Sequence, residues 1–416
     1  MITDRHVGGS REHTMTVRDD ALPTMAQVLD AAVVAPILQR SLGPGAPLPD
    51  VHVHCLRYKP GTNLVVHYDV GIDAAWHDAV IMVASSADLA RRAANTENVR
   101  LARRVDGRSP AAAPLQYDTE LDVLVQWLPL DLRLPALSES PSALRARLRA
   151  EGLRFLLQDS EPTLLNYKPR RRAALRVGGH VVKVYAGHDQ FMNATTGLRT
   201  TSVLREINTP RFEAALPDLQ LTVQELLSGR HPARALDVAR DAGSITAALH
   251  ASHLSELRVT DTMSQLRAAA ASTRLVGSIA PRLRARGDTL LAALELARPP
   301  DLELVPSHGD FHAKQLLRHH GVLAVIDFDE ICAAPAALDL ATFAAHVVRG
   351  DTDDLAQALT ALDSLAEGYG DRPDGLSWYL ATSILRRAPI PFRYLDEQWP
   401  ERMEGMMLAA ETALAR

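Results

Sequence analysis

The chain has 416 residues, of which 47% are hydrophobic and 23% charged, and its formal net charge is −5. This composition is ordinary for a soluble globular protein, and the length leaves room for two or three domains. The negative charge and the lack of a basic tract argue against a nucleic-acid partner. No apolar run approaches the roughly 20 residues that span a bilayer, so we expect no membrane partner.

The termini and cysteines indicate where the protein works. Residues 1–20 are polar and mixed in charge, unlike a signal peptide, and we expect a disordered leader there. Cys55 and Cys332 are too few to form a disulfide framework. Both observations predict a cytoplasmic protein in a reducing environment.

The N-terminal half contains an internal repeat. The segment Leu56–Pro60 (LRYKP) recurs as Leu165–Pro169 (LNYKP), with Lys59 and Lys168 separated by 109 residues (168 − 59). Each copy has a helix-like segment, this motif, two strands and a further strand, in the same order. The predicted pairs are 23–42 with 141–157, 64–68 with 173–177, 79–83 with 181–184, and 124–129 with 222–227. We therefore predict a duplicated, β-rich lobe.

The two copies differ at one position with chemical meaning. Met82 occupies in the first copy the place of Lys183 in the second, and no catalytic motif follows the first copy. We interpret the first copy as a cap that packs on the second. The predicted domains are a cap over 21–140, a second copy over 141–229 and a helical region over 230–416.

Lys183 is one of only four lysines among 45 basic residues. A composition so biased toward arginine retains lysine where a compact ammonium is needed. Lys183 lies at the centre of an apolar run, Val181–Tyr185, where a buried charge requires an anionic partner. The alternative is an edge strand with Lys183 facing solvent.

The second copy continues as a sheet, a helix and a final strand. Strands over 163–168, 173–178 and 180–186 form an antiparallel sheet whose first turn, Arg170–Arg172, either contacts phosphates or is solvated. A helix starts near Asp189, with Glu206 near its end as a weak candidate partner for the lysine. A strand over 221–227 ends the copy.

The C-terminal half carries a set of residues suited to phosphoryl transfer. A strand-like segment, 302–306, leads into the turn His308-Gly309-Asp310, and Gln315 follows five positions after Asp310 (315 − 310). A hairpin through His319-His320-Gly321 brings Gln315 and Asp327 to the same end. One carboxylate to orient a hydroxyl, with an amide and a second carboxylate for a metal, is what phosphoryl transfer needs.

These segments resemble the aminoglycoside phosphotransferase and choline kinase-like family, whose pattern reads H-G-D-x-x-x-x-N followed by I-D-[FW]-[DE]. The chain departs from this pattern at Gln315, where most relatives have Asn. The resemblance implies an α+β, protein-kinase-like fold with a small antiparallel β lobe and a helical C-lobe. The duplicated N-terminal lobe is similar to the cap of maltokinase-type sugar kinases.

The resemblance also implies roles for single residues. Asp310 orients and deprotonates the acceptor hydroxyl, and Gln315 and Asp327 bind Mg²⁺ on the phosphates. Lys183 binds the nucleotide phosphates. The backbone of Gln224, Glu225 and Leu226 meets the adenine edge, and His308 and Asp339 support the loop. Asp329 either assists the metal or lies at the substrate entrance. Lys314 either neutralises the transferring group or faces solvent.

A zinc site formed by His308, His312, His319, His320 and Cys332 is a weaker interpretation. His308 and His312 stand four apart, but Gly309 makes this stretch a turn and not a helix that presents both rings on one face.

We predict a small-molecule kinase that transfers the γ-phosphoryl group of ATP or GTP to a hydroxyl of an aminoglycoside, a sugar or a similar metabolite. The alternatives are a catalytically impaired, nucleotide-binding pseudokinase or regulator, and an interaction module. Scattered C-terminal acids suit a cationic acceptor, whereas Trp378, Tyr379, Phe392 and Tyr394 suit a sugar. The sequence leaves the acceptor, the nucleotide preference and the oligomeric state open.

Overall fold

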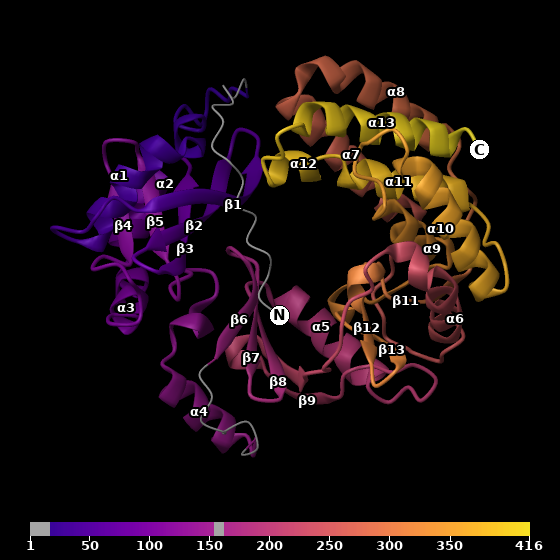
Figure 1. Ribbon diagram of the computed structural model, residues 1–416, viewed down its shortest axis with the longest axis horizontal. Coiled ribbons are helices and arrows are strands. Elements are labelled where there is room, and N and C mark those ends of the chain that lie inside the picture. Colours follow the sequence, from indigo (N-terminus) through magenta and orange to yellow (C-terminus); the bar gives the residue numbers. More distant parts are fainter. Residues whose placement is uncertain (1–16, 154–161) are drawn as a thin grey trace. The chain divides into compact units, whose positions relative to one another are not determined.

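The computed structural model describes residues 17–153 and 162–416, which form two compact units (Figure 1). The N-terminal unit holds the described residues up to His188 together with Ala214–Val223 and Arg393–Glu397. The C-terminal unit holds Asp189–Glu213, Gln224–Phe392 and Gln398–Arg416. Within the described ranges, none of the helices has the length and apolar character to span a membrane. Most of the predicted leader, residues 1–16, lies outside these ranges.

The first copy of the repeat folds as a five-stranded antiparallel sheet in the order β1-β2-β3-β5-β4. The strands are β1 (Asp50–Lys59), β2 (Asn63–Ile72), β3 (Ala75–Val83), β4 (Leu115–Asp118) and β5 (Val123–Trp127). Helix α1 (Ala31–Leu42) precedes the sheet, and α2 (Ser86–Ala94) and α3 (Thr96–Arg104) connect β3 to β4. Asn95 caps α3 by accepting hydrogen bonds from the backbone N–H groups of Glu97 and Asn98.

The second copy repeats this topology, with strand order β6-β7-β8-β10-β9. The strands are β6 (Thr163–Lys168), β7 (Arg172–Val177), β8 (His180–Tyr185), β9 (Phe212–Leu216) and β10 (Leu221–Glu225), and α4 (Pro141–Ala150) precedes them. The same order in both copies confirms the predicted duplication. Strand β9 was not predicted.

The sheet register places Met82 and Lys183 at equivalent positions. Met82 pairs with Val65 across β2 and β3, and Lys183 pairs with Ala174 across β7 and β8. Val65 and Ala174 are 109 residues apart (174 − 65), the offset of the sequence repeat. Lys183 is 6% exposed on an interior strand, which excludes the solvent-facing edge strand.

An aspartate at the start of each copy fastens the first hairpin in the same way. In the first copy, Asp19 Oδ2 accepts hydrogen bonds from the Tyr58 hydroxyl and the Gly61 N–H, both at 2.7 Å. Tyr58 belongs to the repeated motif, so this contact joins the start of the copy to the repeated hairpin.

In the second copy, Asp131 Oδ2 accepts hydrogen bonds from the Tyr167 hydroxyl at 2.8 Å and the Arg170 N–H at 2.7 Å. Both aspartates open the sequence D-x-x-L-P, at Asp19 and Asp131. The sequence comparison missed this motif because it compared apolar segments. The repeated contact begins ten residues before the predicted start of the second copy (141 − 131).

The two sheets share one hydrophobic core. Buried members from the first copy include Met82 and Leu124, and members from the second include Tyr167 and Val223. Arg170, from the predicted arginine turn, donates a hydrogen bond to the Met82 sulfur at 3.5 Å. The first copy therefore packs on the second, as the sequence predicted.

The C-terminal unit is mostly helical, which with the two sheets confirms the predicted α+β class. Its helices are α5 (His188–Thr201), α6 (Ala239–His250), α7 (Thr262–Ile279), α8 (Arg284–Leu296), α9 (Ala337–Ala345), α10 (Asp354–Tyr369), α11 (Leu376–Arg387), α12 (Ile390–Arg393) and α13 (Trp399–Leu414). Two antiparallel ribbons pair β11 (Leu304–Ser307) with β14 (Cys332–Pro335), and β12 (Leu316–His319) with β13 (Val322–Val325). Every residue of α9 is buried, so this helix belongs to the core of the C-terminal unit.

One predicted helix is shorter than expected. Helix α5 ends at Thr201, so Glu206 lies beyond the helix and is exposed. The apolar residues Leu204 and Ile207 continued the helical spacing, but the chain turns there. Glu206 Oε2 instead accepts a hydrogen bond from the neighbouring Arg205 N–H at 3.2 Å.

The duplication offers an internally controlled stability test. We expect Asp131→Ala to lower the free energy of unfolding by about 2–4 kcal/mol, because it leaves two donors in a buried site without an acceptor. Asp131 is 1% exposed, whereas Asp19 is half-buried, so Asp19→Ala should cost about 1 kcal/mol. Urea unfolding of both variants measures the difference. Equal losses would contradict the role assigned to burial.

Candidate active site

The predicted catalytic turn follows β11 directly. Ser307, the last residue of β11, pairs with Cys332 of β14, so the turn His308–Asp310 starts from a fixed strand end. Gly309 has φ +80°, and a Cβ added there would lie 2.1 Å from the carbonyl oxygen of Glu330. Only glycine fits this close approach, which explains the residue type between His308 and Asp310.

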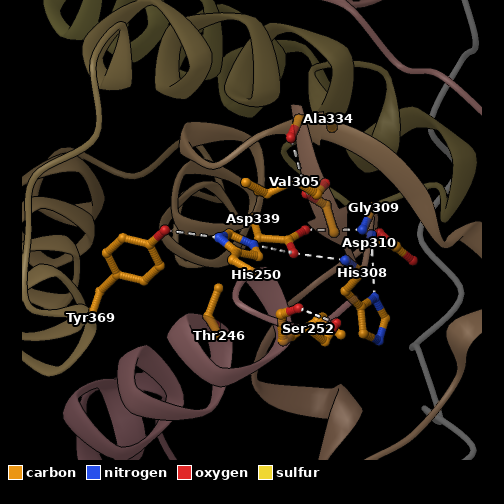
Figure 2. A network of polar contacts seen from close by, with 12 residues as sticks. Thr246, His250, Ser252, Val305, His308, Gly309, Asp310, Ala334, Asp339 and Tyr369 are labelled. Atoms are coloured by element: carbon orange, nitrogen blue, oxygen red, sulfur yellow. Dashed lines mark hydrogen bonds and ion pairs between the residues drawn. The ribbon is translucent and has the colours of Figure 1, made fainter. Parts of the chain in front are cut away.

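The buried carboxylate of Asp339, near the start of α9, holds the turn (Figure 2). Its Oδ2 accepts a hydrogen bond from the His308 N–H at 2.7 Å, and its Oδ1 accepts one from the Gly309 N–H at 2.9 Å. His250 Nε2 lies 3.2 Å from Oδ2, and His250 Nδ1 lies 3.0 Å from the Tyr369 hydroxyl. The carboxylate thus has three donors from two other segments.

These donors also explain the charge state of Asp339. Burial alone would raise the pKa of this fully buried carboxyl group, but His250 and the His308 backbone hold that pKa below its ordinary value. The carboxylate therefore stays ionised and keeps both backbone bonds. This geometry agrees with the supporting role predicted for Asp339.

His308 joins the catalytic turn to the strand that leads into Asp327. The His308 Nε2–H donates to the carbonyl oxygen of Ile326 at 3.0 Å, and Nδ1 accepts from the Asp310 N–H at 3.4 Å. The ring is fully buried and packs against Phe311 and Phe328. Both ring nitrogens are used, as a bracing residue requires.

Gln315 and Asp327 meet at the base of the β12–β13 hairpin, as predicted. Gln315 Nε2 lies 3.3 Å from Asp327 Oδ2, and the Ile326 N–H donates to the Gln315 carbonyl at 2.9 Å. Asp327 has φ +68°, a left-handed conformation that aspartate tolerates better than most residues. In this orientation the Gln315 amide donates its N–H to the Asp327 carboxylate. The amide also carries an oxygen, and amide and carboxylate oxygens are the ligand types that suit Mg²⁺.

Helix α5 contacts the segment after Asp327, a connection that the sequence analysis missed. Asn193 Nδ2 donates to the carbonyl oxygens of Asp329 at 2.7 Å and Ile331 at 3.2 Å. A Cβ on Gly197 would lie 2.4 Å from the Phe328 carbonyl oxygen. The helix therefore approaches the backbone around the buried Asp329. The sequence signal for this close approach was Gly197 within the predicted helix, four positions after Asn193 (197 − 193).

The side chain of Asp310 is 45% exposed and faces His346, which the sequence analysis also missed. His346 Nε2 lies 3.9 Å from Asp310 Oδ1. The His346 ring stacks on His312 with 3.9 Å between ring centroids, and Arg387 Nη1 donates to His346 Nε2 at 2.7 Å. His346 and Arg387 come from segments after α9 and at the end of α11, so no local pattern links them to Asp310.

The stacked imidazoles are neutral. The pKa of His312 is lowered to about 3, mainly by burial and also by the charges of His308 and Arg387. Burial also lowers the pKa of His346 well below its ordinary value, as do Arg387, His312, Lys314 and Arg386 in that order. Neutral His346 can accept the hydrogen bond from Arg387, and neither uncharged ring forms an ion pair with the Asp310 carboxylate.

The remaining predicted residues lie as follows. Gln224 is buried, and within the described part of the chain its Oε1 has no hydrogen-bond partner. The Glu225 N–H donates to the Arg211 carbonyl at 3.0 Å, so this N–H is not available to adenine, and Leu226 is half-buried. Lys183 belongs to the N-terminal unit, and its nucleotide contact remains a prediction.

The aromatic candidates for a sugar platform divide into two groups. Trp378, Tyr379 and Phe392 are at most 3% exposed and belong to the helical core, whereas Tyr394 is 58% exposed. Among the acids, Glu367 pairs with Arg240.

Comparison with known proteins identifies the region that carries this site. Residues 198–376 match the model of the phosphotransferase enzyme family (APH), and the match includes Asp310, Gln315, Asp327 and Asp339. This region is similar to the phosphotransferase enzyme family, in agreement with the resemblance predicted from the sequence. No curated protein among those compared matches the sequence.

Solved structures with partial likeness include three kinases. A choline/ethanolamine kinase family protein from Mesorhizobium loti has 12% identity and a TM-score of 0.48 over 66% of this chain and 95% of its own. Spectinomycin phosphotransferase APH(9)-Ia, in complex with ADP and spectinomycin, has 16% identity and a TM-score of 0.45 over 66% and 99%. Amicoumacin kinase hAmiN, in complex with AMP-PNP, Ca²⁺ and Ami, has 15% identity and a TM-score of 0.47 over 66% and 96%.

Proposed function

We propose that the protein transfers the γ-phosphoryl group of ATP or GTP to a hydroxyl of a small molecule, with Asp310 as the base. The observation that supports this most is the arrangement of one short loop. Asp310 lies on a turn fixed by Asp339, and the same loop ends at Gln315, 3.3 Å from Asp327. Phosphoryl transfer depends on such positioning of a hydroxyl and a metal-bound phosphate.

Asp310 would orient the acceptor hydroxyl and accept its proton as the oxygen attacks phosphorus. Its carboxylate is 45% exposed, so an acceptor can reach it, and the backbone on its N-terminal side is held by buried hydrogen bonds. The neutral His346 beside it leaves Asp310 as the basic group of this pair. A positioned base of this kind typically contributes about 10²–10⁴-fold to the rate.

Gln315 and Asp327 would hold Mg²⁺. A rotation of the Gln315 amide by half a turn replaces Nε2 with Oε1 next to Asp327, so both residues can present oxygen to the ion. Bound Mg²⁺ neutralises charge on the donor phosphates. Gln315 has the same donor and acceptor atoms as the asparagine of most relatives, with one more methylene.

The charges near Asp310 favour a neutral or anionic acceptor over a polycationic one. Lys314, Arg386 and Arg387 all act electrostatically on His346, which lies beside Asp310. Lys314 is exposed, and its loop precedes Gln315 directly. An aminoglycoside would bring several ammonium groups toward these cations, whereas a sugar hydroxyl meets no such repulsion. We therefore propose sugar-type acceptors ahead of aminoglycosides.

A transfer screen tests the function and the acceptor class. Amino sugars, maltose, other sugars and aminoglycosides are incubated with Mg²⁺ and labelled ATP or GTP, and we expect transfer to a sugar-type acceptor. Asp310→Ala should lower turnover by about 10²–10⁴-fold because the base is lost. Asp374→Ala, which removes an exposed acid elsewhere in the same unit, should leave turnover unchanged.

Equal turnover in wild type and Asp310→Ala would remove Asp310 as the base. Nucleotide binding without transfer to any acceptor would instead favour the pseudokinase. A preference for aminoglycosides would contradict the argument from charge while leaving the phosphotransferase function in place.

The duplication supplies the matched substitution for Lys183. Lys183→Met introduces the residue that the cap carries at the equivalent position, Met82, which is 2% exposed. We expect the variant to fold and the KM for ATP to rise by about 10–10²-fold, because a charge-assisted hydrogen bond to phosphate contributes about 1.5–3 kcal/mol. The control is Lys59→Met, an exposed lysine of the cap. An unchanged KM for ATP would exclude Lys183 from nucleotide binding.

A further inference from the structure

The sheet of the cap carries a cluster of metal-ligand residue types that phosphoryl transfer does not use. His54 and Cys55 lie on β1, His67 and Asp69 on β2, and Asp78 on β3. One ligand atom from each of His54, Cys55 and His67 lies within 4.8 Å of the others. The same limit holds for His67, Asp69 and Asp78, so His67 is common to both groups.

A β-bulge explains how these residues converge. The pairing of β1 with β2 shifts between Val53 and Cys55, so His54 is an extra residue and Cys55 pairs with His67. A bulge places two residues opposite one and turns the local strand, which lets adjacent side chains approach one partner. Asp69 follows His67 by two residues and pairs with Asp78, so these three share a face of the sheet.

His67 has the hydrogen bonding of a metal ligand. Its side chain is 3% exposed, and Nε2 lies 2.8 Å from Asp78 Oδ1. Its Nδ1 is buried and has no hydrogen-bond partner among the residues that the structure describes. If Nε2 carries the proton that binds Asp78, Nδ1 presents a lone pair, which is costly to bury unused. A carboxylate behind a histidine is the arrangement that orients a metal-binding imidazole.

His54 and Cys55 complete the donor set. His54 Nδ1 lies 3.0 Å from Asp69 Oδ2, so a carboxylate also lies behind this ring. The rings of His54 and His67 are 4.6 Å apart between centroids. The pKa of the Cys55 thiol is raised to about 11, mainly by burial and also by Asp69, against the opposing effects of Lys168 and Arg393. A metal that binds Cys55 must therefore displace the thiol proton.

The second copy of the lobe lacks these ligands. The position 109 residues after His67 is Arg176 (176 − 67), and its cross-strand partner is Thr163. The duplicated sheet therefore does not require these ligand residues, since the second copy has the same strand order with other residues at these positions. The cap carries it and has Met82 in place of the lysine.

We propose that the cap binds one Zn²⁺-type ion through a ring nitrogen of His54, the sulfur of Cys55 and Nδ1 of His67. Two imidazoles and a thiolate select a borderline transition metal over Mg²⁺, which requires oxygen ligands. Tetrahedral zinc needs ligand atoms about 3.3–3.8 Å apart, whereas these atoms lie within 4.8 Å of one another, so the side chains close by at most about 1–1.5 Å. Water fills the fourth position, and Asp69 remains hydrogen-bonded to His54 Nδ1.

The site would stabilise the cap where it meets the second copy. The ring of Tyr167, which Asp131 holds, packs edge-on against His67 with 5.2 Å between centroids. A metal bound to β1 and β2 fixes the position of His67 and so of this contact. The ion is structural in this proposal and takes no part in phosphoryl transfer.

Metal binding by the purified full-length chain tests the proposal. After removal of metal, Co²⁺ is added to wild type and to the ligand variants Cys55→Ser and His67→Gln. We expect one equivalent to bind wild type with the thiolate-to-metal charge-transfer band and the visible bands of tetrahedral Co²⁺, and Zn²⁺ to displace it. Both ligand variants should lose the charge-transfer band and bind at least ~10²-fold more weakly. Asp78→Asn should weaken binding by about 10–100-fold.

The matched controls are His52→Gln, two residues from His54 on the same strand, and Cys332→Ala, which removes the other cysteine. Both should keep the wild-type band. Absence of the band in folded wild-type protein overturns the proposal, as does a band that Cys332→Ala abolishes. If a ligand variant fails to fold, the wild-type and control spectra decide alone. None of these measurements depends on phosphotransferase activity.

Discussion

The site depends on one buried carboxylate. Asp339 accepts the backbone N–H groups of His308 and Gly309 and faces His250, so the charge is compensated although the residue is fully buried. A buried carboxylate without such donors would cost several kcal/mol. Because the bonds go to backbone atoms, they fix the path of the chain immediately before Asp310. Asp339 is therefore a positioning residue that acts through the loop.

Further contacts connect this loop to the end of the hairpin where Gln315 and Asp327 meet. His308 bonds the Ile326 carbonyl, and Asn193 of α5 bonds the backbone on either side of Glu330. The turn and helix α5, which are distant in sequence, therefore both hold the backbone between Ile326 and Ile331. In the duplicated lobe, by contrast, the fold is present without the candidate site residue. The cap has the same sheet and the same aspartate contact, but it has Met82 where the second copy has Lys183.

Local patterns predicted most of the fold and the centre of the site. The turn at Asp310, the hairpin from Gln315 to Asp327 and the paired strands all have signals within a few residues. His346 lies 36 residues after Asp310 (346 − 310) and joins it only through packing, so no spacing indicated it. Asn193 was missed for the same reason. The predicted helix end, near Glu206, was wrong because apolar residues continue at helical spacing beyond Thr201, the last residue of α5.

A double-mutant cycle tests the central claim most directly, namely that Asp339 acts through Asp310. The turnover of Asp339→Asn, Asp310→Ala and the double variant is compared under saturating substrates, with folding checked by circular dichroism. The account predicts that Asp339→Asn lowers turnover by about 10–10²-fold and that the double variant is no slower than Asp310→Ala alone. If the fold losses in turnover of the two single variants multiply in the double variant, Asp339 does not act through Asp310.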